Sequence, residues 1–182
     1  MDFEKSLKPI WNDLVRFSRS LTGSRAAGDD LLQEALLRAW RSRLQLRSAD
    51  SFRPWLFTII HKTHLSMTRL RWIKRLARLE EAEEIVSETG MHFVEREVVR
   101  SALQTLPLVQ REAIILFEVL DYPAAQIAVI QKTSLSAVKS RLARGREKLL
   151  KAYLRLSETP AHLERASDSA SVNPKQGEEE IA

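Results

Sequence analysis

The sequence predicts an all-α protein of two small helical domains joined by a linker, with a helix-turn-helix in the C-terminal domain. Only five glycines and six prolines interrupt the 182 residues. Apolar side chains recur at the three- and four-residue spacing of helices with one buried face, and the alternation of β-branched residues that marks a strand is absent. Helices are expected over residues 5–21, 28–42, 52–74, 94–105, 108–120, 123–131 and 135–154.

A change of composition in the middle of the chain predicts the domain boundaries. Over residues 75–93 the helical apolar pattern fades and acidic residues gather, which indicates a linker. It would separate an N-terminal domain, 1–74, from a C-terminal domain, 94–156, although a charged helical extension as far as Ile85 is also compatible with the sequence. Residues 157–182 are polar and poor in large apolar side chains, so we expect a disordered tail.

Charge and composition narrow the function classes. The net charge is +5, but residues 157–182 hold six acidic and two basic side chains, which leaves +9 on residues 1–156. That excess favours a polyanionic partner, with a solvated basic surface as the alternative. The chain has no cysteine, and His61 and His64 lack an acidic neighbour that would complete a metal site. No nucleophile–base set or glycine-rich phosphate loop appears, so we expect no enzyme, no metal and no cofactor.

The apolar segments are too short to predict membrane insertion. The first residues lack the apolar core of a signal peptide, and no apolar run approaches the roughly 20 residues that span a bilayer. We therefore expect a cytoplasmic protein.

Residues 123–150 have the pattern of a helix-turn-helix. A short helix carries Ile127 and Ile130, a polar break follows, and Ser134 is the expected N-cap of a longer basic helix. The second helix of such a motif enters the major groove of DNA. An ordinary amphipathic helix with a charged face is the alternative.

A helical projection divides this second helix into a buried side and a DNA-facing side. Leu135, Val138, Leu142, Gly145 and Leu149 share the buried side. Small polar groups and one arginine suit base edges, whereas cations at the margins suit phosphates. The candidates for DNA contact are Ser136, Lys139, Ser140, Arg141, Ala143 and Arg144, with Glu147 on the same side.

Four segments carry a resemblance to a known family. "ALQTLPLVQREAIILFEVL" and "AAQIAVIQKTSLSAVKSRLARGREKL" resemble the C-terminal DNA-binding domain of bacterial sigma factors of the extracytoplasmic-function (ECF) group. "DDLLQEALLRAW" and "FRPWLFTIIHKTHLSMTRLRW" resemble their N-terminal domain. The resemblance implies a transcription initiation factor that binds RNA polymerase core and directs it to promoters. In this family the C-terminal helix-turn-helix reads the minus-thirty-five element.

The first of the N-terminal segments contains a candidate protein-binding face. Leu37 falls among charged side chains, opposite an apolar arc, as an anchor within a polar rim would. A lone exposed leucine is commonplace and is the alternative. In sigma factors the matching surface docks on a coiled coil of the largest polymerase subunits. The resemblance thus implies polymerase binding by Asp30, Gln33, Glu34, Leu37 and Arg38.

The expected helix over residues 52–74 alternates aromatic and basic side chains on one face, which is typical of single-stranded DNA binding. Packing of Phe57 and Trp72 against a neighbouring helix is the alternative. On the opposite face, residues such as Phe52, Leu56 and Leu70 are expected to point inward. The resemblance implies that this helix captures the melted minus-ten strand and that the preceding loop, 42–51, holds a flipped-out base. The candidate contacts are Phe57, His61, Lys62, His64, Leu65, Thr68, Arg69 and Trp72.

Several positions depart from the family pattern. Lys62 and Ser66 stand where many members have asparagine and aspartate, and Gln126 replaces a common glutamate. Gln131 replaces an apolar residue and Lys132 a frequent glycine. These departures leave the promoter sequence open and allow a degenerate member that reads DNA poorly.

Two alternatives to promoter-directed initiation remain, and one further partner is implied. The chain could be a helix-turn-helix regulator that acts on duplex DNA without polymerase. It could also be a sigma-like decoy that titrates regulators. For a sigma factor, the resemblance additionally implies an anti-sigma partner and a role in stress response.

Overall fold

A computed structural model describes residues 2–46, 48–78 and 91–158, and these residues form helices and turns without a strand. The predicted all-α fold class is confirmed for this part of the chain. The expected linker lies partly outside the described residues, because α4 continues to Arg78 and α5 begins at Met91. Most of the expected tail, residues 159–182, also lies outside them.

The first expected helix, over residues 5–21, is divided into three elements. These are α1 (Phe3–Leu7), the 3₁₀ turn η1 (Lys8–Ile10) and α2 (Trp11–Thr22). Pro9 explains the division, because proline has no backbone N–H to continue the hydrogen-bond ladder of an α-helix. Phe3 of α1 then packs edge-on against Trp40 and Phe52 with ring centroids about 5.5 Å and 5.4 Å away.

Two glycines shape the corner between α2 and α3 (Arg25–Ser42). Gly23 ends α2 at φ +74°, a left-handed conformation that glycine adopts without steric cost. Ser24 caps α3 by accepting a hydrogen bond from the Ala27 N–H at 3.4 Å. At Gly28, a Cβ atom would lie 2.5 Å from the Arg19 Cα, so this glycine lets the two backbones pack closely.

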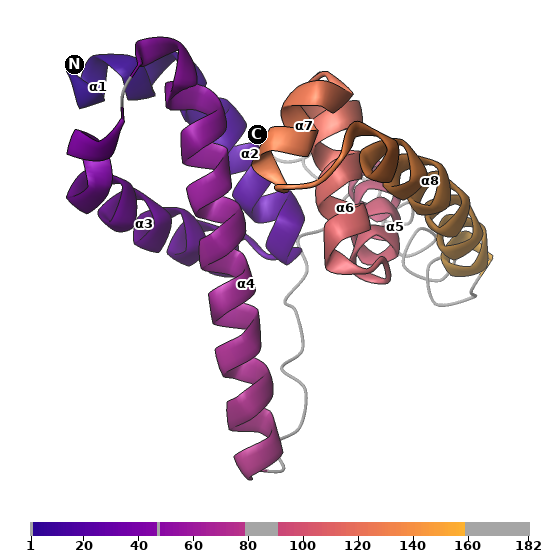
Figure 1. Ribbon diagram of the computed structural model, residues 1–182. Helices are drawn as coiled ribbons and strands as arrows, with labels where there is room; N and C mark the ends of the chain where they lie inside the picture. The colour runs from indigo at the N-terminus through magenta and orange to yellow at the C-terminus, as the bar shows by residue number, and fades with distance from the viewer. Residues whose placement is uncertain (1, 47, 79–90, 159–182) are drawn as a thin grey trace, which may run out of the picture.

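Two 3₁₀ turns, η2 (Arg43–Gln45) and η3 (Ala49–Ser51), lead into α4 (Phe52–Arg78). The first half of α4 packs on α3, whereas the second half runs beyond the rest of the domain (Figure 1). Leu70 is consequently 57% exposed, and the expectation that it points inward is wrong.

The C-terminal helices are α5 (Met91–Gln104), α6 (Leu108–Ile114), α7 (Ala124–Ile130) and α8 (Leu135–Ser157). The expected helix over residues 108–120 changes from α to π geometry at η4 (Ile115–Val119). There the Leu120 N–H bonds the Ile115 carbonyl at 3.2 Å, which is the five-residue spacing of a π turn. The following backbone turns back, and the Tyr122 N–H bonds the Leu116 carbonyl at 2.9 Å.

The N-terminal helices (residues 3–78) and the C-terminal helices (91–157) pack directly on one another. α2 contacts α5, α6 and η4, and α4 contacts α7 (Figure 1). We call this contact region the interdomain seam. Buried residues from both sides form one continuous apolar cluster, which packs the helix-turn-helix against α4.

Candidate polymerase and nucleic-acid interfaces

Most residues that the sequence predicts to face DNA are exposed on α8. Ser134 is its N-cap, because its Oγ accepts a hydrogen bond from the Ala137 N–H at 3.1 Å. Val138, Leu142 and Gly145 are buried. Leu135 is 44% exposed, so its expected burial is wrong; it belongs to the first turn of the helix. The exposed candidates are Ser136, Lys139, Ser140, Ala143 and Arg144.

Arg141 differs from the other candidates on α8. Its side chain is half-buried, and its Nη1 donates a hydrogen bond of 2.7 Å to the Gln131 Oε1. The Gln131 amide in turn donates to the Val109 carbonyl at 2.9 Å and to the Glu112 Oε2 at 2.7 Å. Arg141 therefore ties α8 to the turn and, through Gln131, to the buried Glu112.

The turn before α8 contains a strained residue. Lys132 has φ +48°, the left-handed region in which an L side chain crowds the backbone. This is the position at which the family pattern has a frequent glycine, so the departure has a structural cost here.

Lys132→Gly should raise the free energy of unfolding by about 1 kcal/mol, because glycine removes the left-handed penalty. Urea denaturation of the full chain measures this change. Lys132→Ala is the matched control, since alanine loses the same charge but keeps a Cβ. Equal stability of the two variants would contradict the strain argument.

The predicted polymerase face lies along α3. Leu37 is 48% exposed, and Asp30 and Gln33 are exposed beside it. Half-buried Glu34 and Arg38 form an ion pair one turn apart, with 2.7 Å between the Arg38 Nε and the Glu34 Oε1. The structure therefore brings the five predicted residues together on one side of α3.

A shallow apolar groove adjoins this face, and the sequence did not predict it. It lies between α1 and α3. Its lining residues are Phe3, Glu4, Leu7, Gln33, Leu36, Leu37 and Trp40. The groove makes Leu37 part of a larger apolar surface, which favours a docking anchor over a lone exposed leucine.

The predicted minus-ten face of α4 is only partly exposed. Lys62, Leu65, Thr68 and Arg69 are exposed, and His64 is half-buried. The side chain of Trp72 lies outside the described residues. This face of α4 is therefore covered where the C-terminal helices pack on it and exposed farther along the helix.

The expectation that Phe57 and His61 lie on the solvent face is wrong. The Phe57 ring is fully buried, with centroids 5.1 Å from Phe17 of α2 and 5.0 Å from Tyr122 of the C-terminal part. The His61 Nδ1 lies 2.8 Å from the Glu112 Oε1 and is buried with it. Both side chains point into the interdomain seam, because α7 and the preceding loop cover this half of α4.

Charges from the two sides meet at the edge of the interdomain seam. The Lys132 ammonium, together with partial burial, lowers the pKa of the exposed Lys62. Nearby, the Arg53 guanidinium lies 4.5 Å from the centre of the Tyr122 ring and bonds the Asp13 carboxylate at 2.7 Å. Burial is the main reason that the pKa of Tyr122 is raised.

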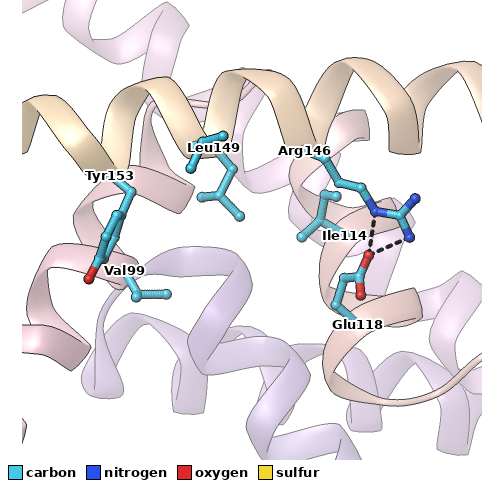
Figure 2. Close-up of a pocket in the computed structure, with 7 residues that line it drawn as sticks. Val99, Ile114, Glu118, Arg146, Leu149 and Tyr153 are labelled. Atoms are coloured by element: carbon cyan, nitrogen blue, oxygen red, sulfur yellow. Dashed lines mark hydrogen bonds and ion pairs between the residues drawn. The ribbon is translucent and has the colours of Figure 1, made fainter.

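A second apolar groove lies between α5, α6, η4 and the C-terminal half of α8, and Figure 2 shows it. The Arg146–Glu118 ion pair, 2.6 Å between the closest atoms, borders it. Its apolar lining comes from Val99, Ile114, Leu149, Leu150 and Tyr153. The sequence analysis did not predict this groove, because its residues come from three segments of the chain.

The described residues show neither a metal-binding cluster nor a membrane-spanning helix. That part of the chain contains no cluster of three or more His, Asp or Glu side chains able to hold a metal ion. None of its helices is both long enough and apolar enough to span a bilayer.

Comparisons with known proteins identify the family. Residues 96–149 match the model of sigma-70 region 4, and residues 12–61 match the Sigma2 domain of PhyR. The ECF RNA polymerase sigma factor EcfG of Rhodopseudomonas palustris is 36% identical over 148 residues, which cover 75% of this chain and 76% of the relative. The chain belongs to the ECF RNA polymerase sigma factors. The predicted resemblance to ECF sigma factors is thereby confirmed, and the chain is a transcription initiation factor.

Solved structures agree with the fold of this ECF sigma factor. The sigma factor RpoE of Bartonella quintana, in complex with the anti-sigma factor NepR, superimposes with a TM-score of 0.74 at 26% identity, over 83% of this chain and 96% of RpoE. CnrH, in complex with the cytosolic domain of CnrY, gives a TM-score of 0.62 at 25% identity, over 86% and 89% of the two chains.

Proposed function

We propose that this ECF sigma factor binds RNA polymerase core through α3 and directs it to promoters through α8 and α4, in the cytoplasm. The observation that carries the proposal is the outward side of α8. Ser136, Ser140 and Arg144 stand exposed on a helix that buried Val138 and Leu142 hold in place. A rigid helix with small polar groups and one arginine outward suits the major groove of the minus-thirty-five element.

The polymerase contact is assigned to the α3 face. Leu37 is an apolar anchor next to a groove, and the Glu34–Arg38 ion pair and Asp30 supply a polar rim around it. In such an interface the apolar centre supplies most of the binding free energy, and the charged rim fixes the orientation of the partner. α3 and α8 lie on opposite sides of the molecule (Figure 1), which leaves α8 free for DNA.

The minus-ten contact is assigned to the exposed half of α4. Lys62 and Arg69 supply positive charge for the backbone, and Leu65 supplies an apolar surface for an unstacked base. Phe57 and His61 can take part only after the interdomain seam opens, because both are buried there. Trp72 stays a candidate by its place in the sequence.

An anti-sigma protein is the third proposed partner. The relatives RpoE and CnrH were solved in complex with NepR and with the cytosolic domain of CnrY. We expect affinity purification of the tagged chain from resting cells to recover such a protein. Recovery of polymerase subunits alone, in both resting and stressed cells, would count against it.

In vitro transcription with purified core polymerase on a library of genomic fragments tests the function. The expected result is transcripts from a subset of fragments that share upstream elements. A chain that binds core without giving transcripts would be the degenerate member that reads DNA poorly, whereas a chain that binds neither core nor DNA would favour the sigma-like decoy. A chain that binds duplex DNA but not core would be the helix-turn-helix regulator acting alone.

Arg144→Ala should cost about 1–3 kcal/mol of binding free energy and relax the preference at one or two positions of the upstream element. Lys139→Ala should weaken binding more evenly across sequences and lower its salt dependence, as expected for a phosphate contact. Holoenzyme binding to a set of promoter variants separates the two effects. An unchanged ranking of the variants with Arg144→Ala would show that Arg144 does not read bases.

A further inference from the structure

The interdomain seam divides the proposed minus-ten face into a covered half and a free half. Phe57 and His61 lie under Tyr122 and Glu112, whereas Leu65, Thr68 and Arg69 farther along α4 are exposed. We call this packing of the two domains the closed arrangement. A base cannot stack on the covered half while the seam is intact.

The first contact that holds the seam is a polar cap on the C-terminus of α2. The last carbonyls of a helix lack partners within that helix, and cations are favourable beside them. The Gln104 Nε2 donates to the Ser20 carbonyl at 3.2 Å, and the Arg111 Nη1 donates to the Leu21 carbonyl at 2.9 Å. Arg111 is fixed by further bonds to the carbonyls of Gln104 and Leu106, so the cap is rigid.

The second contact is the His61 cluster, which consists of His61, Glu112, Gln131 and Arg141. Glu112 is fully buried, and its two carboxyl oxygens meet His61 from α4 and Gln131 from the turn before α8. Arg141 then bonds Gln131. His61 is the member that comes from the N-terminal domain, so separation of the domains leaves one oxygen of a buried carboxyl group without this partner.

The third contact surrounds the Tyr122 ring. Arg53 lies over one side of it, and Phe57 packs against it with centroids 5.0 Å apart. Close by, the Arg16 Nη2 donates to the Val119 carbonyl at 3.3 Å. One interaction opposes closure, because Lys62 and Lys132 repel each other across the same seam.

We infer that the chain inhibits itself: the α2 cap, the His61 cluster and the Tyr122 contacts hold the sigma factor in the closed arrangement, and the seam must open before the melted strand can be captured. The occupant of the covered half of α4 is thus the C-terminal domain of the same chain. The inference rests on the proposed minus-ten role of α4. When the seam opens, the polar groups exchange their hydrogen bonds to each other for hydrogen bonds to water. The free-energy difference between the closed and the open arrangement is therefore modest, and binding of a partner can overcome it.

Distance measurement between two spin labels tests closure without polymerase or DNA. Because the chain has no cysteine, Asn12→Cys in α2 and Lys148→Cys in α8 give one label on each domain; both positions are exposed. The full chain should show one narrow distance population. A broad distribution would overturn the inference at this step.

Single substitutions in the labelled chain test which contacts hold the seam. His61→Ala removes the bond to Glu112 and should raise the ratio of long to short distances about tenfold, because it leaves a buried carboxyl oxygen without its partner in the closed arrangement. Gln104→Ala should act in the same direction from the other end of the seam. Lys132→Gln is the matched control, because it removes a repulsion and should not open the chain. Unchanged distances in both His61→Ala and Gln104→Ala would overturn the assignment.

Cross-linking connects closure to activity. Arg16→Cys and Val119→Cys lie at the seam but outside every proposed binding face. A short bis-methanethiosulfonate cross-linker can join them, because each cysteine thiolate displaces methanesulfinate to form a disulfide that dithiothreitol later cleaves. The cross-linked sigma factor should give at least about tenfold fewer open complexes, even on a template already mismatched across the minus-ten region, and cleavage should restore them. Equal yields before and after cleavage would overturn self-inhibition. A chain that opens as expected yet never forms open complexes would instead contradict the proposed function.

Discussion

Leu37→Asp should weaken binding of the sigma factor to RNA polymerase core by about 30-fold or more. The substitution places a charge where a half-exposed leucine meets the groove between α1 and α3. Truncation of an apolar anchor at the centre of an interface typically costs 2 kcal/mol or more, and an uncompensated carboxylate adds desolvation. Titration of labelled core with the purified variant measures the loss.

Leu44→Asp is the matched control for this experiment. Leu44 is 89% exposed in η2, outside the α3 face, so the same chemical change there should leave core affinity within about threefold of the parent chain. Circular dichroism should show equal helicity for the two variants. Similar affinities of the Leu37 and Leu44 variants would remove α3 from the polymerase interface.

Phe57→Ala should lower the free energy of unfolding by about 3–5 kcal/mol, the usual cost of deleting a buried phenyl ring. The ring is fully buried between Phe17 and Tyr122, so its loss leaves a cavity on both sides of the interdomain seam. Chemical denaturation of the full chain measures the effect. Such a loss would identify Phe57 as a core residue in the free sigma factor.

Leu65→Ala provides the comparison on the same helix. Leu65 is 41% exposed on the free half of α4, so its truncation should change stability by no more than about 0.5 kcal/mol while lowering the yield of open complexes. Equal free energies of unfolding for Phe57→Ala and Leu65→Ala would contradict the burial of Phe57 in the interdomain seam.

Helix positions and the outer faces of α3 and α8 could be predicted from the sequence because each of these helices buries a single side. Helical periodicity distinguishes a buried side from an exposed side, and it placed Leu37 and Arg144 correctly on exposed surfaces. The break in the first helix could also have been predicted from Pro9, because proline interrupts the hydrogen bonds of an α-helix. The sequence analysis nevertheless predicted one continuous helix there.

Periodicity failed for α4 because two different partners bury two of its sides. α3 covers one side, and α7 with the preceding loop covers the other, so Phe57 and His61 are buried although they lie opposite Leu56. A helical projection cannot identify a neighbour that is distant in the sequence. The π turn at Ile115–Val119, which precedes Tyr122, has no periodic signature either.

The sequence did not predict the burial of the polar residues Glu112 and Gln131. Glu112 follows Gln110 and Arg111 at the start of an apolar run, and Gln131 occupies a position where the family pattern has an apolar residue. A buried polar side chain needs a partner, but the sequence shows neither that Glu112 is buried nor which residue pairs with it. The 2.8 Å contact with His61, which is 51 residues away in the sequence, is a tertiary feature.

The extension of α4 beyond the N-terminal domain has a kinetic consequence. Leu65, Thr68 and Arg69 stay exposed in the closed arrangement, so a DNA strand can bind this distal segment of α4 first. Contacts can then extend along the helix toward Phe57 as the seam opens. Capture would then follow an induced-fit sequence, in which the observed rate rises with DNA concentration, and would not be limited by a slow spontaneous opening step. Stopped-flow mixing with a premelted template distinguishes the two orders, because a rate that falls toward the spontaneous opening rate as DNA is added would indicate that opening comes first.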